Sequence, residues 1–338
     1  MYTLAIGWLA ISIPVFSNPQ PPKNRALENK TTMKLKIFLL FLISLCLLYF
    51  IFTPKRFLSP LVSQIVSSPT STPSPPPVVF LGLVGDLGLG RHITSLARSK
   101  NDFSWPFAQI YPWLQSHDFN LANLESPIIA DCPEGKTGTF TFCGDTKFLP
   151  YLSENKLILN LANNHTLNYG QDGFRQTESF LAQSNILYFP KFTSTSYHGI
   201  SFGFLGYDFI SNPQLDPQTL IDDVKKYDPA VDWLTVSIHW GNEYLPSAET
   251  WRINLAHQLV DAGADIIHGH HPHVWQGYEL YKEKPIFYSF GNFIFDQSWS
   301  YETSHSQIAE LKLSKTRVES LKLFPIEIKY NSQPVLLP

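Results

Sequence analysis

The stretch 268-HGHHPHV-274 places four histidines within seven residues, although the whole chain of 338 residues contains only eleven. Histidine is an unusual core residue, because a neutral imidazole carries one donor and one acceptor that both need partners once buried. Imidazole nitrogens are also common metal ligands. This density therefore indicates a metal site, with His270 and one or both of His271 and His273 as ligands, whereas His268 is expected to pack behind them.

Polar residues follow five apolar runs that are typical of buried strands. A single cluster of this kind usually closes a turn or caps a helix, but ligands bind at the carboxyl ends of the strands in α/β sheets. Five clusters at strand ends therefore predict one shared site. They are Asp86 after 78–85, 123-NLES-126 after 119–122, 163-NNH-165 after 157–162, 239-HWGNEY-244 after 233–238 and 270-HHPH-273 after 264–269.

The mixture of carboxylate, amide and imidazole groups decides which metal is expected. Such sets suit Mn, Fe or Zn better than Mg²⁺ or Ca²⁺, which prefer oxygen ligands alone. The candidates are numerous enough for one or two divalent ions, and paired ions lie about 3.5–4 Å apart around a shared carboxylate and water. That water would be the nucleophile of a hydrolytic reaction.

The elements that must position these residues alternate between strand and helix patterns. Helical spacing of apolar residues occurs at 105–117, 170–185 and 247–263, the last with Ser247 as the expected N-cap. The tail at 307–330 alternates like an antiparallel hairpin. The sequence therefore predicts a layered α/β domain over 78–338. Its expected strands are 78–85, 157–162, 200–207, 233–240, 264–270 and 286–292.

The N-terminal part of the chain has a different composition. Residues 37–53 are an uncharged apolar run of 17 residues, at the short end of what spans a membrane as a helix. Basic residues are more numerous before this run than after it, which favours a cytoplasmic N-terminus (1–36) and a globular domain outside the cell membrane. We expect an uncleaved single-pass anchor, a Pro- and Ser-rich stalk at 54–77, and a mis-called start at 1–32 ahead of Met33.

Charge and cysteine content restrict the partners and the compartment. Residues 1–77 hold seven of the 25 Lys and Arg and one of the 28 Asp and Glu, so the remainder carries 18 basic and 27 acidic residues. This acidic balance argues against nucleic acid as the partner of the globular domain. Cys132 and Cys143 flank a short loop, and either a disulfide in an oxidising compartment or two free thiols fits the sequence.

The motifs resemble the capsule-synthesis protein CapA family, the poly-γ-glutamate biosynthesis group of the calcineurin-like metallophosphoesterase superfamily. The resemblance covers about residues 78–300. It implies a four-layer α/β/β/α sandwich with a dinuclear metal centre between the two sheets. It rests on 85-GDLGLGR-91, 121-LANLESPI-128, 160-NLANNHTLNYGQDG-173, 239-HWGNEY-244 and 263-GADIIHGHHPHVWQGYELYKEKPIFYSFGNFIFDQ-297.

The resemblance also implies a role for individual residues. Asp86 matches the first metal carboxylate and Glu125 the bridging acid, while Asn164 and His239 match single ligands. His270 and His273 match the closing pair, although the choice between His271 and His273 stays open. His165 matches a general acid, and Arg91 and Glu243 are expected to line the substrate cleft, Arg91 for an anionic group and Glu243 for orientation.

Two positions depart from the family pattern. Related enzymes begin with Asp-x-His, whereas Leu87 and Gly88 follow Asp86, so one imidazole is missing from the first metal. An Asp commonly follows the Asn-Asn-His motif, whereas this chain has Asn168.

Two classes of function fit these features. The first is a metal-dependent hydrolase or transferase of capsule or poly-γ-glutamate biosynthesis, acting on a phosphoester or an anionic polymer substrate through a metal-activated water. The second is a non-catalytic component of a capsule export assembly that binds the polymer. In both, the partners are the membrane, through the N-terminal helix, and membrane proteins of capsule synthesis.

Overall fold

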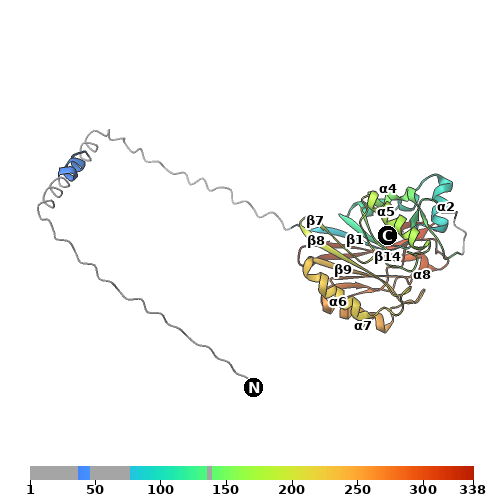
Figure 1. The fold of residues 1–338 in the computed structure, drawn as a ribbon. Coiled ribbons are helices and arrows are strands. Elements are labelled where there is room, and N and C mark those ends of the chain that lie inside the picture. The colour runs from blue at the N-terminus through green and yellow to red at the C-terminus, as the bar shows by residue number, and fades with distance from the viewer. Residues whose placement is uncertain (1–36, 46–76, 135–138) are drawn as a thin grey trace, which may run out of the picture. The chain divides into compact units, whose positions relative to one another are not determined.

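The computed structural model describes residues 37–45, 77–134 and 139–338. The expectations for 1–36, for the second half of the apolar run and for nearly all of the stalk lie outside these ranges. Residues 37–45 are helical. Within the described ranges, no helix is long and apolar enough to cross a membrane. The chain divides into two units at Thr72 and Pro73, and the second unit contains both sheets (Figure 1).

The first sheet of the second unit has eight strands. Its centre is parallel, and the antiparallel hairpin predicted for the tail extends it on one side. In order, the strands are β16 (Gln333–Leu336), β15 (Val318–Lys329), β14 (His305–Leu313), β1 (Val79–Leu87), β2 (Phe119–Leu124), β5 (Leu157–Asn160) and β6 (Tyr188–Phe189), with β13 (Asn292–Ile294) also paired to β1.

The second sheet has six strands, of which the inner four are parallel. Its order is β11 (Tyr278–Tyr281), β12 (Lys284–Phe287), β10 (Ile266–His270), β9 (Trp233–His239), β8 (Ile200–Asp208) and β7 (Phe192–Tyr197). A small separate pair is formed by β3 (Ile128–Ile129) and β4 (Gly144–Asp145).

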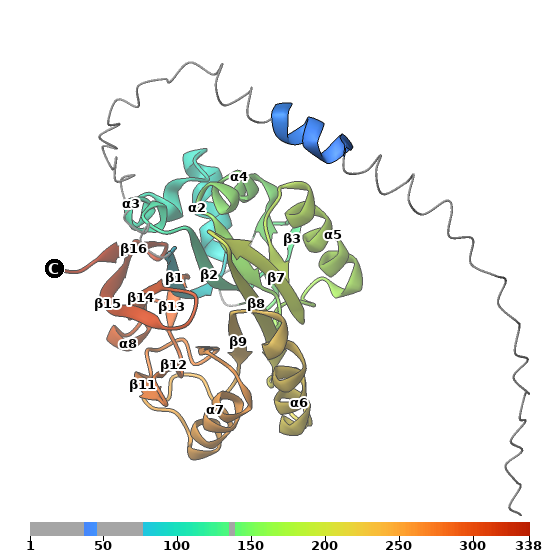
Figure 2. The same cartoon turned by 90° about the vertical axis from the view of Figure 1, so that its left-hand side faces the viewer.

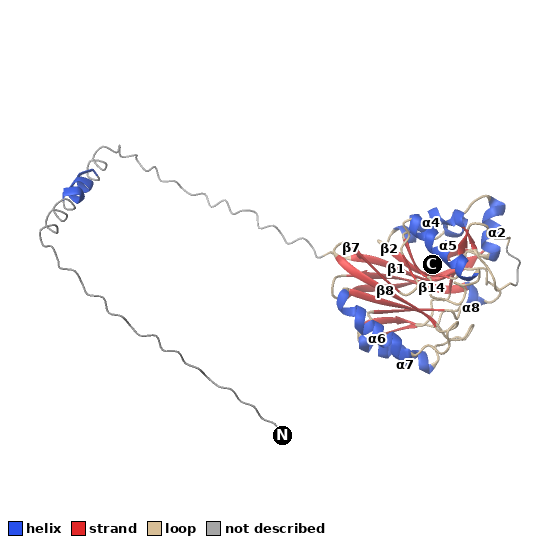
Figure 3. Cartoon of the chain, in the orientation of Figure 1, coloured by secondary structure: helices blue, strands red, loops and turns tan. Residues whose placement is uncertain are grey.

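Helices cover the outer faces of the two sheets (Figures 2 and 3). The first sheet is covered by α2 (Arg91–Lys100), α3 (Tyr111–Gln115), α4 (Leu149–Glu154) and α5 (Gly170–Gln183), and the second by α6 (Pro217–Tyr227) and α7 (Thr250–Ala262). The remaining turns are α8 (Tyr301–Ser304), η1 (Trp105–Phe107), η2 (Thr146–Phe148) and η3 (Asp228–Ala230).

Three apolar layers hold this arrangement together. Strand residues alternate between faces, so Leu81 and Leu83 of β1 share one buried apolar layer between the sheets with Phe202 and Phe204 of β8. Two further layers join each sheet to its own helices. The predicted mixed α/β class is confirmed, and the layers follow the predicted order α/β/β/α.

Three local predictions were wrong. The stretch 105–117 is not one helix, because Pro112 has no N–H to donate in a continuous helix and instead sits in the first turn of α3. The stretch 286–292 is not one strand, because the chain turns at Gly291 (φ +70°) and passes from β12 in one sheet to β13 in the other. The N-cap of α7 is Glu249 rather than Ser247.

The close approach at Gly85 supplies a test of the fold. A Cβ here would lie 1.9 Å from the carbonyl oxygen of Gly291, a backbone atom that accepts from the N–H of Asp86 at 2.9 Å. We expect Gly85→Ala to destabilise the domain by about 1–3 kcal/mol or more, as overpacking does, measured as a lower Tm. Gly199→Ala is the control, because its Cβ meets nothing within 4 Å and adds only backbone strain at φ +79°. If Gly85→Ala and Gly199→Ala had the same Tm, this account of Gly85 would be contradicted.

Candidate metal centre

The carboxyl ends of strands from both sheets meet at one place. In the first sheet, Asp86 of β1 pairs in register with Asn123 of β2 and with Asn292 of β13. In the second, His239 of β9 pairs with His270 of β10. Strand pairing therefore brings residues that are far apart in the sequence to one junction, and all five side chains are fully buried.

Two carboxylates form the centre of this junction. Asp86 and Glu125 are both fully buried, and the Nδ2 group of Asn123 lies 3.0 Å from Asp86 Oδ1 and 2.9 Å from Glu125 Oε1. Glu125 Oε2 has no hydrogen-bond partner. A buried acceptor without a donor is costly, so this atom indicates that a cation belongs beside it.

Burial and neighbouring charges separate the two acids. Burial opposes ionisation of Asp86, but hydrogen bonds from His270 and His273 outweigh it and hold the pKa of this carboxyl well below its usual range. Burial raises the pKa of Glu125 well above its usual range, and the adjacent Asp86 carboxylate adds to the effect. Two acids this close are a carboxylate pair that a metal ion would stabilise.

His273 faces this pair with a fixed tautomer. Asn292 Nδ2 donates to the carbonyl of Thr303 at 3.0 Å, so Asn292 Oδ1 must accept from His273 Nδ1 at 2.9 Å. In the neutral ring the proton is therefore on Nδ1, which also lies 3.3 Å from Asp86 Oδ2, and the Nε2 lone pair lies 3.8 Å from the unpartnered Glu125 Oε2. Two lone pairs across this distance fit two ligands of one ion, each about 2.0–2.2 Å from it.

His270 is held differently from His273. His268 Nε2 donates to the carbonyl of Val84 at 2.9 Å, and burial lowers the pKa of His268 well below its usual value, so its Nδ1 is an acceptor. His270 Nε2 therefore donates to His268 at 3.0 Å. His270 Nδ1 then lies 3.0 Å from Asp86 Oδ1, so both ring nitrogens have a polar partner.

Asn164 and His239 approach the junction together. Asn164 Oδ1 lies 2.9 Å from His239 Nε2, and the other ring nitrogen lies 3.6 Å from Glu125 Oε1. Burial lowers the pKa of His239 well below its usual value. The ring is therefore neutral, which is the form that binds metals.

His271 contributes a second unpartnered atom. Its Nδ1 is buried without a hydrogen bond, and its ring centroid lies 4.8 Å from that of His239. Burial lowers its pKa to about 3, so the ring is neutral. The ligand atoms of His271, His273 and Glu243 lie within 4.8 Å of one another, as do those of Asp86, Glu125 and His273.

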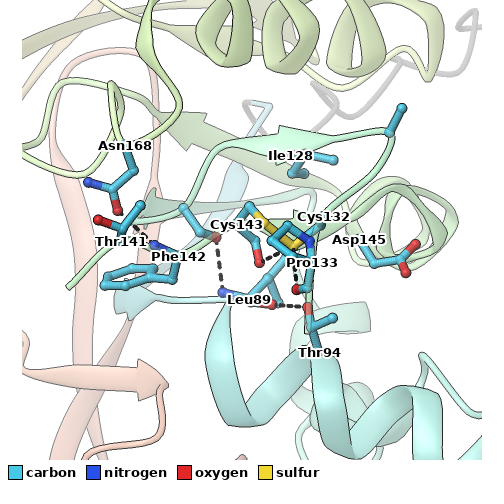
Figure 4. The surroundings of a disulfide bond; sticks show 12 residues. Leu89, Thr94, Ile128, Cys132, Pro133, Thr141, Phe142, Cys143, Asp145 and Asn168 are labelled. Atoms are coloured by element: carbon cyan, nitrogen blue, oxygen red, sulfur yellow. Dashed lines mark hydrogen bonds between the residues drawn. A yellow bond between two sulfur atoms is a disulfide. The ribbon is translucent and has the colours of Figure 1, made fainter. Parts of the chain in front are cut away.

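A hydrogen bond to Asn168 sets the tautomer of His165. The N–H of Phe142 donates to Asn168 Oδ1 at 3.0 Å (Figure 4), which fixes the Asn168 amide. The same oxygen lies 3.3 Å from His165 Nδ1, which must therefore be protonated. Burial lowers the pKa of His165 to about 4, so Nε2 carries no proton near pH 7.

The two predicted cleft residues line one cavity of about 480 Å³. Arg91 is paired with Asp296, and its guanidinium lies 4.7 Å from the centroid of the Phe142 ring. Asp296 therefore balances most of the Arg91 charge within the protein. Glu243 is exposed, and the exposed rings of Tyr244 and Trp299 stand beside it in the cavity wall.

A buried arginine ties together the loop after β9 and the histidine-bearing loop after β10. Arg252 of α7 donates to Glu249 at 2.6 Å and to Gln276 at 2.7 Å, and Gln276 donates to the carbonyl of Leu245 at 2.8 Å. A Cβ at Gly241 would lie 2.7 Å from the guanidinium. Arg252 and Gln276 carry no signal in the sequence, because neither stands at a strand end.

These donor groups fit a divalent metal, since neutral imidazoles, carboxylates and an amide converge around two unpartnered atoms. Asp86, Glu125 and His273 form one candidate set. Asn164, His239, His271 and Glu243 lie around it, whereas both nitrogens of His270 are already engaged. A possible divalent metal site is therefore present, as predicted, and the geometry does not select the metal.

The fold and site define a layered α/β protein with candidate metal ligands at the junction of its sheets. A similar fold occurs in the crystal structure of a hypothetical protein from Thermus thermophilus, with a TM-score of 0.50 and 15% sequence identity, covering 73% of this chain and 99% of that one.

The family follows from the sequence comparison. Residues 80–297 match the family model "Bacterial capsule synthesis protein PGA_cap", and the chain belongs to this family. "Capsule biosynthesis protein CapA" of Bacillus anthracis is 29% identical over 285 residues, covering 74% of this chain and 67% of the relative. "PGA biosynthesis protein CapA" of Bacillus subtilis (strain 168) is 29% identical over 277 residues, covering 74% and 72%. The predicted resemblance is confirmed.

The hydrogen bond from His273 to Asn292 supplies a test of the site. Asn292→Leu removes the acceptor that fixes the His273 tautomer, and we expect metal affinity to fall by about 10–100-fold. Asn292→Asp keeps an acceptor and should retain affinity. Mn²⁺ titration with metal analysis measures both variants. If Asn292→Leu bound Mn²⁺ as tightly as the unmodified protein does, Asn292 would have no part in supporting the metal site.

Proposed function

We propose that this chain is a membrane-anchored, metal-dependent hydrolase or transferase of capsule or poly-γ-glutamate biosynthesis, acting on a phosphoester or an anionic polymer. The observation that carries the metal centre is the pair of facing lone pairs on Glu125 Oε2 and His273 Nε2, 3.8 Å apart. Both side chains are buried, and both belong to the segment that matches the capsule-synthesis family.

The residues of the chain have separate tasks in this proposal. Asp86, Glu125 and His273 would hold one ion, and Asn164, His239 and His271 stand where a second would bind. A bound divalent cation supplies a Lewis acid and lowers the pKa of water. Asn123 orients the two acids through its Nδ2 group, and Asn292 keeps the His273 proton on Nδ1.

Proton transfer to a leaving group would fall to His165. With Nδ1 protonated and the pKa lowered to about 4, the resting ring is a base. It acts as a general acid only after taking up a proton, which a bound anionic substrate would favour. Asn168 orients the ring but adds no charge, unlike the Asp that is common in the family.

The resting tautomer of His165 supports a second candidate function. A chain that only binds polymer for a capsule export assembly needs no positioned proton donor, and His165 has no proton on Nε2 in its resting form. Arg91 would then contribute little charge to polymer binding, because Asp296 already pairs with it. Turnover separates the two candidates.

Location outside the cell membrane is part of the proposal. The apolar run at 37–53, with its flanking basic residues, supports a single-pass anchor. The disulfide between Cys132 and Cys143 (Figure 4) also supports it, since disulfides persist in oxidising compartments.

Hydrolysis of a generic aryl phosphoester tests the enzyme proposal. The full chain with Mn²⁺ should turn over bis(p-nitrophenyl) phosphate, and EDTA should abolish this activity. Asp86→Asn should reduce kcat/KM by more than the roughly 10–100-fold that loss of a supporting residue costs. Asp232→Asn, at the opposite end of β9, is the control and should retain activity. No turnover of phosphoester or polyglutamate by the metal-loaded protein would favour the binding component.

Protease treatment of intact protoplasts tests the membrane topology. If the stalk lies outside, added protease should release a soluble fragment that begins between residues 54 and 77, because extended Pro- and Ser-rich segments are readily cleaved. A cytoplasmic marker protein must stay intact. A domain that is protected until lysis would reverse the proposed orientation.

A further inference from the structure

Glu243 lies beside two histidines whose ligand atoms face it. One ligand atom from each of Glu243, His271 and His273 falls within a 4.8 Å span. His271 Nδ1 is the unpartnered atom of this group, and the His271 residue is only 6% exposed. A buried nitrogen without a partner, on a ring whose ligand atom lies within 4.8 Å of a carboxylate oxygen, indicates a missing cation.

Backbone geometry fixes the two loops against each other. The N–H of Tyr244 donates to the carbonyl of Pro272 at 2.9 Å. Tyr244, His271 and His273 adopt φ values of 63°, 97° and 58°, which are unfavourable for residues with a Cβ. Such strain persists where the surroundings over-determine it, and it concentrates at functional sites. The strained backbone holds Glu243 next to the histidine loop.

His273 cannot serve two ions at once. Its Nδ1 proton is directed at Asn292, so it has one free lone pair, and that nitrogen faces Glu125. Any ion on the cleft side must therefore rely on Glu243 and His271, with the His239 ring 4.8 Å from that of His271. Glu243 also lines the 480 Å³ cavity, so it can reach an ion from the solvent side.

We propose that Glu243 is a metal ligand, and that Glu243 and His271 bind a second divalent cation on the cleft side of the Asp86, Glu125 and His273 position. This rests on the proposed metal centre and changes the role expected for Glu243, from orienting the substrate to holding metal. The mixed carboxylate and imidazole set suits Mn, Fe or Zn. Because Glu243 is exposed, this ion should be the weaker and more readily exchanged of the two.

Mn²⁺ binding to the detergent-solubilised full chain tests this assignment. Equilibrium dialysis with metal analysis should give two equivalents, and electron paramagnetic resonance should detect spin coupling between them. Glu243→Gln should keep the tighter equivalent, weaken the second by at least about 10-fold, and lose the coupled signal. Glu243→Asp retains a carboxylate and should weaken the second equivalent less.

The control is Asp296→Asn, which removes one negative charge from the same cavity without touching the ligand group. It should retain both equivalents. Unchanged Mn²⁺ binding in Glu243→Gln, with lower turnover, would return Glu243 to substrate orientation and overturn the assignment. A single equivalent in the unmodified protein would also overturn it, while leaving the inner position intact. No binding at all would instead overturn the proposed metal centre itself.

Discussion

The structure of the site depends on one constraint, which is that two fully buried carboxyl groups, Asp86 and Glu125, share a junction between two sheets. Two carboxyl groups this close together cannot both be ionised unless a positive charge balances them. The Nδ2 group of Asn123 reaches one oxygen of each acid, but it carries no charge. Compensation must come from the histidines or from a cation, and the facing loops supply sites for both.

The histidines divide into two groups according to what lies behind them. His268 and His270 form a chain that begins at the Val84 carbonyl and ends at Asp86, so both of their rings are engaged. His271 and His273 stand on the following turn, where positive φ values replace strand geometry. Each retains a free nitrogen. His271 and His273 are thus the two histidines of this group with a nitrogen left for a cation, and the role of His270 as a ligand stays a prediction.

The sequence was informative wherever a buried strand ends in a polar residue. Continuous apolar runs identify parallel strands that are buried on both faces, so the polar residues at the ends of β1, β2, β5, β9 and β10 could be expected to meet. The register in which the strands pair and the orientation of the asparagine amides could not be predicted from the sequence. The role of Asn292 depends on the Thr303 carbonyl, and that of Asn168 on the Phe142 N–H. Arg252 acts from a helix through Gln276, a contact without a local sequence signal.

The imidazole that the Asp-x-His motif would supply is absent from β1, but His270 places an imidazole beside Asp86. With Leu87 and Gly88 after Asp86, the first strand offers no imidazole, and a side chain at Gly88 would meet the Phe295 ring, with Cβ 2.6 Å from it. His270, from the other sheet, places Nδ1 3.0 Å from Asp86 Oδ1. An imidazole therefore stands beside the first carboxylate after all, but its far nitrogen is tied to His268. His270 thus joins the two sheets at the site, with one nitrogen directed at the carboxylate of Asp86 and the other at His268.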